Sequence, residues 1–168
     1  MKIVITGFMG SGKSRVAREL AQRLNVEFVD LDERITRSEG RSPAQLIVEE
    51  GEETFRSIET SVLRELLETD TARVIALGGG AWVQETNRAL INQYGYLSVW
   101  LDVAFEVCWA RIAASSEDRP LGRSKDRAQA LYDRRRPVYQ LADLRIDVGD
   151  QAFEEVILTL ITRLTASA

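Results

Sequence analysis

The segment from Gly7 to Ser14 constrains this chain more than any other. It reads GFMGSGKS and matches the pattern G-x-x-x-x-G-K-[ST] in full. An apolar, strand-like run at residues 2–6 precedes it, and a helical pattern begins at about residue 13. Glycines let successive backbone N–H groups curl around phosphate oxygens, and the following helix adds the positive end of its dipole. The segment predicts a phosphate-binding loop; a glycine-rich turn that matches by chance is the alternative, and the flanking strand and helix argue against it.

The residue types in this loop indicate that it binds the phosphates of a nucleotide. Lys13 is expected to reach the β- and γ-phosphates, and the Ser14 hydroxyl is expected to coordinate Mg²⁺. We expect ATP to be bound by Gly10, Ser11, Gly12, Lys13, Ser14 and Arg15. A GTPase would need a D-x-x-G switch and an N/T-K-x-D guanine reader, and the sequence contains neither. Because motor and transporter ATPases normally need a longer chain than 168 residues, a small P-loop kinase fits best.

Short β-branched runs alternate with helical patterns along the chain, which predicts βαβ units. Strands are expected at residues 2–6, 26–30, 73–77, 96–101 and 143–148. Helices are expected at about residues 13–24, 32–38, 43–50, 52–69, 85–93, 104–114, 125–136 and 151–166. Right-handed crossovers between such strands give a mainly parallel sheet with helices on both faces. The sequence therefore predicts one α/β domain, a three-layer sandwich of the P-loop NTPase type.

The residue types that are missing exclude several classes of chemistry. With no histidine, the chain has no Ser-His-Asp or Cys-His nucleophile, no imidazole acid or base, and no histidine-ligated metal. Its single cysteine, Cys108, cannot form an internal disulfide or a cysteine-rich zinc site. The apolar run before Gly7 is too short for a signal peptide, and no stretch approaches the roughly 18 apolar residues of a membrane span. We expect a soluble, cytoplasmic protein without a membrane partner.

Charge is distributed unevenly along the chain. The segment from Arg111 to Arg136 holds eight cations and four anions and is therefore +4, which leaves −8 for the rest of a chain whose net charge is −4. A basic stretch within an acidic protein favours one local polyanionic ligand over long nucleic acid.

Two carboxylates follow the second expected strand, in Val29-Asp30-Leu31-Asp32. Strand periodicity predicts that Asp30 and Asp32 lie on the same side, at the carboxyl edge where open α/β sheets bind ligands. One carboxylate could hold Mg²⁺, and the other could accept a hydrogen bond from an attacking hydroxyl. The alternative is that Asp32 is only the N-cap of the next helix.

Two further features lie on the expected acceptor side. Gly78, Gly79 and Gly80 follow the third strand, where they permit a ligand to approach the backbone; a plain turn is the alternative. Arg56 lies early in a helix with Glu59 at i+3, which can hold the guanidinium, although such a pair usually forms a solvated face. We expect Trp82, directly after this glycine run, to fill the core rather than to contact the acceptor.

Taken together, these motifs resemble a bacterial shikimate kinase over nearly the whole chain. The matching strings are GFMGSGKS at 7–14, DLD at 30–32, GRSPAQLIVEEGEETFRSIE at 40–59, LGGGA at 77–81, RPL at 119–121 and RRPVY at 135–139. Many proteins share the P-loop alone, whereas this series in this order is highly specific. The resemblance implies a five-stranded parallel sheet in the order 2-3-1-4-5 and a mobile lid.

The resemblance also implies an activity, the ATP-dependent phosphorylation of the 3-hydroxyl of shikimate. Asp32 would hold two shikimate hydroxyls and act on the one that is phosphorylated, and Arg56 and Arg135 would clamp the carboxylate. The backbone of Gly78, Gly79 and Gly80 would complete this pocket. Lys13, Asp32 and a lid residue, Arg119, would be catalytic, and Arg119 would also bind ATP.

For the rest of the nucleotide site, the resemblance implies that Arg111 packs near adenine. Ser14 would ligate Mg²⁺ directly, and Asp30 would engage it through water. The single domain, residues 1–168, would divide into a nucleotide core (1–29, 71–114 and 137–168), an acceptor-binding segment (about 30–70) and a lid (about 115–126).

We expect a monomer whose partners are ATP or ADP and shikimate. A kinase for another polyol acid, such as gluconate, is the alternative among enzymes. A catalytically silent protein that kept the fold is the alternative outside them, and the intact Lys13, Ser14, Asp30 and Asp32 argue against it.

Overall fold

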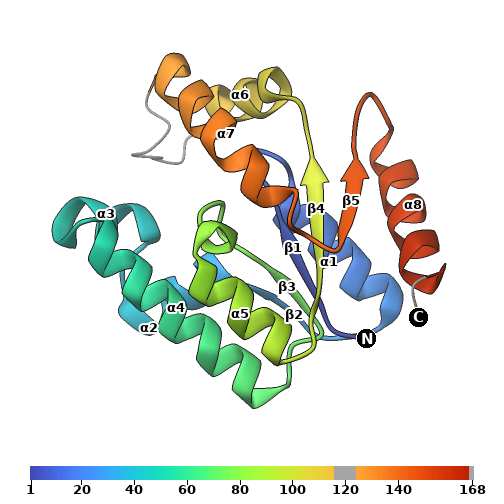
Figure 1. The fold of residues 1–168 in the computed structure, drawn as a ribbon, viewed down its shortest axis with the longest axis horizontal. Helices are drawn as coiled ribbons and strands as arrows, with labels where there is room; N and C mark the ends of the chain where they lie inside the picture. Colours follow the sequence, from blue (N-terminus) through green and yellow to red (C-terminus); the bar gives the residue numbers. More distant parts are fainter. Residues whose placement is uncertain (116–123, 167–168) are drawn as a thin grey trace.

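A computed structural model describes residues 1–115 and 124–166 of the chain. Its five strands form one parallel sheet in the order β2-β3-β1-β4-β5 (Figure 1). The strands are β1 (Ile3–Thr6), β2 (Phe28–Asp30), β3 (Val74–Ala76), β4 (Leu97–Asp102) and β5 (Leu144–Asp147). This confirms the sheet and the strand order that the resemblance implied.

Helices cover both faces of the sheet. They are α1 (Lys13–Leu24), α2 (Leu31–Glu39), α3 (Pro43–Glu50), α4 (Glu52–Thr69), the 3₁₀ helix η1 (Ala81–Val83), α5 (Glu85–Gln93), α6 (Phe105–Ala114), α7 (Lys125–Tyr139) and α8 (Phe153–Ala166). Side chains on β1 alternate between two apolar cores, as strand geometry requires. Ile3 and Ile5 pack with α1 and α8, whereas Val4 packs on the opposite face with the remaining helices. The three-layer architecture is confirmed.

The expected helices and strands agree with the structure to within two residues at almost every end. The exception is α7, which continues through Pro137 to Tyr139, whereas the sequence predicted an end at residue 136. Proline has no N–H to donate to the preceding turn and usually ends a helix. Here the helix end is held by contacts with distant segments, described below. The short η1 was not predicted.

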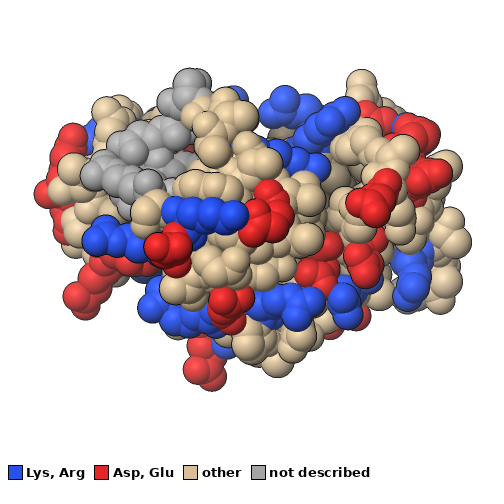
Figure 2. Space-filling model, turned by 90° about the horizontal axis from the view of Figure 1, so that it is seen from above, with Lys and Arg blue, Asp and Glu red and all other residues tan. Residues whose placement is uncertain are grey.

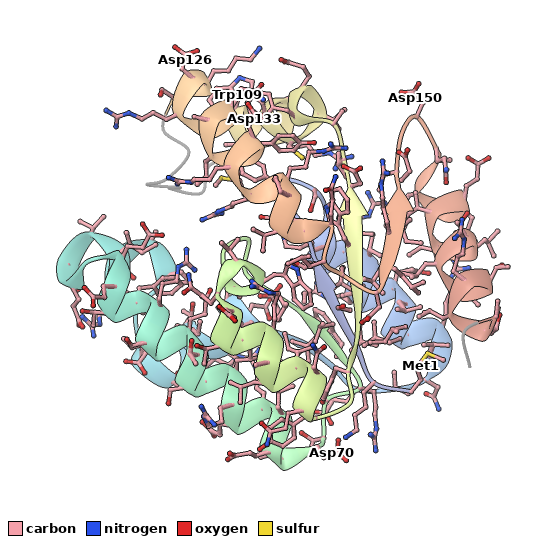
Figure 3. All side chains as sticks on the ribbon, viewed as in Figure 1. Met1, Asp70, Trp109, Asp126, Asp133 and Asp150 are labelled. Atoms are coloured by element: carbon pink, nitrogen blue, oxygen red, sulfur yellow. The ribbon has the colours of Figure 1, made fainter. Side chains whose placement is uncertain are left out.

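The carboxyl edge of the sheet is the upper edge in Figure 1, where the strand arrows point. Asp150, in the connection between β5 and α8, lies at this edge in Figure 3, and Asp70, after α4, lies at the opposite edge. The chain leaves β1, β2 and β3 at the upper edge as well, so their loops meet there. None of the helices within residues 1–115 and 124–166 is both long and apolar enough to cross a membrane.

Candidate active site

The loop after β1 folds tightly before α1 begins at Lys13. The Ser11 backbone N–H donates to the Phe8 carbonyl at 3.1 Å, which closes a turn. Gly10 has a φ of +77°, and a Cβ there would lie only 2.6 Å from the Cys108 carbonyl oxygen. A side chain at this position would therefore be both strained and in collision with α6. The glycine makes room for the loop to pack directly on α6.

Basic side chains surround this loop. Lys13, which is buried, donates from Nζ to the Phe8 carbonyl at 2.9 Å. Arg111, near the end of α6, donates from Nη1 to the Gly10 carbonyl at 3.1 Å. Arg15 places its guanidinium 3.9 Å from the centroid of the Phe153 ring, and it lines the same cleft as Lys13 and Arg111. The loop thus presents a cradle for a polyanion, formed by backbone N–H groups and three cations.

Asp30 connects the phosphate loop to the acceptor side. Its Oδ2 accepts a hydrogen bond of 2.5 Å from the Ser14 hydroxyl, and its Oδ1 accepts from the backbone N–H groups of Asp32 and Glu33 at 3.0 and 3.2 Å. Asp30 is therefore the N-cap of α2, and the alternative that placed the cap at Asp32 is wrong. Strand alternation is also not what brings the two aspartates together, because the chain turns into a helix at Leu31. Asp32 faces the cleft from the first turn of α2.

The Ser14–Asp30 pair suits a divalent cation that is also held by phosphates. Mg²⁺ prefers oxygen ligands and is usually bound through one or two protein groups, substrate phosphates and water. A hydroxyl and a carboxylate at 2.5 Å from each other, beside the phosphate loop, match that preference. No group of three or more acidic or cysteine side chains that could hold a metal occurs in the described part of the chain. The residues present therefore fit a metal that arrives with the nucleotide rather than a site built from protein alone.

Each of the three glycines after β3 lies against charged side chains, and Gly78 lies against two, because a Cβ there would also lie 3.1 Å from Glu59 Oε1. A Cβ at Gly78 would lie 2.6 Å from Asp32 Oδ1, and one at Gly79 would lie 3.7 Å from Arg135 Nη1. A Cβ at Gly80 would overlap the Arg56 guanidinium. The glycine run is therefore more than a turn, because it lets one carboxylate and two guanidinium groups converge on a stretch of bare backbone.

Arg56 is held by a buried carboxylate. Its Nη1 donates to Glu59 Oε1 and Oε2 at 2.9 and 2.8 Å, and its Nη2 donates to Glu52 at 3.3 Å. The Glu59 side chain is only 1% exposed and that of Arg56 13%, so the pair does not form a solvated face. Burial raises the pKa of Glu59 to about 7, against the attraction of Arg56. The guanidinium is thus fixed before any ligand arrives.

Three consecutive arginines on α7 have different environments. Arg135 is buried and lines the cleft, and burial lowers the pKa of its guanidinium. Arg136 instead pairs with Asp102 at 3.1 Å, and Arg134 is exposed. The resemblance implied Arg135, among these three, as the residue of the acceptor pocket, and Arg135 is the one that lines the cleft.

These groups line one cleft of about 1060 Å³ along the carboxyl edge. All the candidate residues that the structure describes contribute to it except Ser11, whose buried hydroxyl lies under the loop without a hydrogen-bond partner in the described part of the chain. Figure 2, which looks onto this edge, shows Lys and Arg side chains gathered beside a hollow. Arg119 and most of the expected lid lie outside the described residues.

Helix α3 lies within the expected acceptor-binding segment of about 30–70, but none of its residues was named as a site residue. Helix α3 contributes Pro43, Ala44, Gln45, Ile47, Val48 and Glu49 to the lining. The start of α3 is well marked, since Ser42 caps it and Gln45 completes a capping box. That signal identifies a helix but not the face that a ligand meets, which depends on how α3 packs on α4. Trp82 is 1% exposed and fills the core, as expected.

Comparisons with known proteins point to one family. The shikimate kinase family model matches residues 9–165 of the chain. A shikimate kinase of Salinibacter ruber is 38% identical over 179 aligned residues, which cover 100% of this chain and 86% of that protein.

Solved structures agree with this match. The shikimate kinase from Acinetobacter baumannii in complex with shikimate has a TM-score of 0.90 at 32% identity, over 99% of this chain and 93% of that one. The shikimate kinase from Aquifex aeolicus has a TM-score of 0.85 at 36% identity, over 99% of this chain and 98% of that one.

Proposed function

This chain belongs to the shikimate kinase family, and from that premise we propose that it transfers the γ-phosphoryl group of ATP to the 3-hydroxyl of shikimate. The products are ADP and shikimate 3-phosphate, in a step of aromatic amino acid biosynthesis. The observation that carries the proposal is the convergence of Asp32, Arg135 and Arg56 on the glycine run. This run packs against the phosphate loop, since a Cβ at Gly79 would lie 3.4 Å from the Met9 backbone nitrogen. One carboxylate and two guanidinium groups are complementary to a small molecule with one carboxylate and several hydroxyls.

On the acceptor side, Arg56 and Arg135 bind the shikimate carboxylate, and the backbone of the three glycines closes the pocket beneath it. Asp32 accepts hydrogen bonds from the ring hydroxyls and takes up the proton of the attacking one. Glu59 keeps the Arg56 guanidinium in place for this contact. The acceptor is therefore oriented with its hydroxyl toward the nucleotide, which is the main requirement of phosphoryl transfer.

On the nucleotide side, the backbone of Gly10, Ser11 and Gly12 surrounds the phosphates, and Lys13 neutralises the charge that develops on the transferring group. For that contact, the Lys13 ammonium exchanges its bond to the Phe8 carbonyl for phosphate oxygens. Arg111 and Arg15 lie toward the α-phosphate and the nucleoside. We further propose Arg119 as the lid residue that reaches the transferring phosphate, with the segment of about 115–126 as the lid, 30–70 as the acceptor segment and the remainder as the nucleotide core.

Ser14 and Asp30 are the residues that would hold Mg²⁺, the first directly and the second through water. When bound with ATP, Mg²⁺ supplies charge neutralisation at the β- and γ-phosphates. The hydrogen bond between the Ser14 hydroxyl and the Asp30 carboxylate already holds these two groups next to each other.

A coupled assay of ADP release with shikimate and with gluconate tests the proposed function. We expect turnover with ATP, Mg²⁺ and shikimate, and none with gluconate, which lacks the ring that this carboxylate and guanidinium arrangement matches. Turnover with gluconate alone would identify another polyol acid kinase, and binding of shikimate without turnover would identify a catalytically silent relative. We also propose that the enzyme acts as a monomer in the cytoplasm, which sedimentation and cell fractionation test.

A further inference from the structure

Two hydrogen bonds tie helix α7 to distant residues of the sequence, one to Gly79 in the glycine run and one to Trp82 just after it. The Tyr139 hydroxyl donates to the Gly79 carbonyl at 2.5 Å. In the opposite direction, Trp82 Nε1 donates to the Val138 carbonyl at 3.0 Å. Tyr139 and Trp82 are each only 1% exposed, so both donor side chains are buried, while the two acceptor residues are half-buried.

These two bonds hold the part of α7 that most needs support. Pro137 has no N–H, so the last turn lacks the helical hydrogen bond that residue 137 would otherwise donate. The turn nevertheless keeps its helical form through Tyr139, and it does so where the bonds to Gly79 and Trp82 are made. Contacts with Gly79 and Trp82 therefore add to the local hydrogen bond from the Gln140 N–H to the Arg136 carbonyl, which remains at this end.

Arg135 lies one helical turn before Tyr139, on the same face of α7. The two side chains meet at Gly79: the Tyr139 hydroxyl donates to its carbonyl, and a Cβ at Gly79 would lie 3.7 Å from Arg135 Nη1. The phenol and the guanidinium thus share the Gly79 backbone as a common contact. Burial raises the pKa of Tyr139 to about 12, so the hydroxyl stays protonated and can donate to Gly79 throughout the neutral range.

The second guanidinium of the site, that of Arg56, is held in place by an ion pair within α4. Arg56 depends on Glu59 and packs over Gly80, the neighbour of Gly79. The separation of the two guanidinium groups is therefore set by α4 on one side and by the α7 contact with the glycine run on the other. A carboxylate that bridges both groups needs that separation to be constant.

We propose that Tyr139 is a positioning residue for acceptor recognition, which holds the Arg135 guanidinium over Gly79 at the spacing from Arg56 that a carboxylate requires. This inference rests on the proposed function, because it takes the shikimate carboxylate as the group that Arg135 binds. Tyr139 acts through Arg135 and touches neither ATP nor the reacting hydroxyl.

Tyr139→Phe tests the proposal, because it removes the hydroxyl and keeps the ring that stacks on Trp100. We expect the KM for shikimate to rise about tenfold, the range of a lost buried hydrogen bond, while the KM for ATP and kcat stay within about twofold. Tyr96→Phe is the matched control. Its hydroxyl is also buried and also donates to a backbone carbonyl, that of Ala72 at 2.6 Å, but at the opposite edge of the sheet.

A second acceptor separates positioning from general loosening of the protein. Shikimate methyl ester keeps the ring and the hydroxyls but lacks the negative charge that Arg135 binds. We expect Tyr139→Phe to lower the preference for shikimate over the ester about tenfold, whereas Tyr96→Phe leaves this preference unchanged. If Tyr139→Phe fails to fold, Trp82→Phe loosens the same end of α7 and is expected to shift the preference in the same direction.

The outcomes distinguish this inference from the proposed function. An unchanged preference in a folded Tyr139→Phe protein, or the same change in Tyr96→Phe, overturns the role of Tyr139. Failure of the unmodified protein to phosphorylate shikimate overturns the proposed function instead, and that experiment needs no variant.

Discussion

Arg56 donates from one nitrogen, Nη1, to both oxygens of the Glu59 carboxylate, at 2.9 and 2.8 Å, and that carboxylate is almost completely buried. The pair links the stability of α4 to the geometry of the acceptor pocket. A carboxylate in this position faces a large desolvation cost, which the guanidinium offsets only in part.

The first prediction concerns pH and Glu59. Its pKa rises from 4.5 to about 7 on folding, so between these values the folded protein binds more protons than the unfolded chain. The stabilisation from this group is present below pH 4.5 and is lost as the pH rises through 7, a change on the order of 3 kcal/mol. Urea unfolding at about pH 4 and pH 8 should show the wild type losing that much free energy of unfolding relative to Glu59→Gln. Exposed Glu65, replaced by Gln, is the control, and an equal pH response in both variants would contradict the prediction.

The second prediction concerns Asp32, the proposed proton acceptor. Asp32→Asn keeps the size of the side chain and should leave ATP affinity unchanged, but kcat should fall at least about a hundredfold, since an amide cannot take the proton. Isothermal titration with ATP and the coupled assay measure the two effects. The control is Asp133→Asn on the exposed side of α7, which should have no effect. Near-normal turnover by Asp32→Asn would remove its assigned role.

The third prediction concerns the chemistry of the carboxylate clamp. Arg56→Lys keeps a positive charge but loses the planar fork that can serve Glu59 and the acceptor together. We expect the KM for shikimate to rise at least about tenfold with little change in the KM for ATP. Arg34→Lys, in an exposed pair with Glu65, is the control. Unchanged acceptor affinity would mean that Arg56 is only a structural partner of Glu59.

The fourth prediction tests whether residue 80 must lack a side chain so that the Arg56 guanidinium can lie against its backbone. Its φ of −106° is open to any residue, so Gly80→Ala causes no backbone strain, but the new methyl group occupies the place of the Arg56 guanidinium. We expect the KM for shikimate to rise about tenfold because the guanidinium is displaced, and thermal stability to fall because Glu59 then loses part of its pairing with Arg56. Unchanged shikimate affinity together with unchanged stability would show that Arg56 moves aside freely.

The fifth prediction separates the two roles of Asp30. Asparagine is a good N-cap but carries no charge, so Asp30→Asn should keep the melting temperature of the protein and raise the Mg²⁺ concentration needed for half-maximal activity. Asp30→Ala should show the same Mg²⁺ effect and also lose about 1 kcal/mol of unfolding free energy. Mg²⁺ titrations and thermal melts of both variants give the comparison. An unchanged Mg²⁺ requirement in both would restrict Asp30 to its role as a cap.

The sequence predicts most of this architecture because the relevant rules are local. Alternating periodicity, capping residues and glycine breaks locate nearly all helices and strands, and the P-loop fixes the edge of the sheet that binds the ligand. The end of α7 is different. Pro137 is a local stop signal, and what overrides it is a pair of hydrogen bonds to Gly79 and Trp82, more than 50 residues away along the chain. No pattern within the helix contains that information.

The same division applies to the site. The sequence pattern draws attention to Asp32 and Arg56, and the resemblance adds Arg135, but neither reveals that each side chain lies against its own glycine. Asp30 and Asp32 do lie at the same edge of the sheet, as predicted, but strand alternation is not the reason. Asp30 is the N-cap of α2, and Asp32 lies in the first turn of that helix. Glu59 is likewise covered by Gly78, a residue outside α4, because a Cβ there would lie 3.1 Å from Glu59 Oε1.

The neighbouring arginines of α7 make the active site sensitive to chain length. Successive residues of a helix are turned by about 100°, which is why Arg135 enters the cleft while Arg136 meets Asp102. One residue inserted between Lys125 and Arg135 would rotate the preceding part of the helix against this fixed end and disturb its packing on α6. Relatives that differ in length here are therefore expected to accommodate the change ahead of Ser124, where the register of α7 is not yet set.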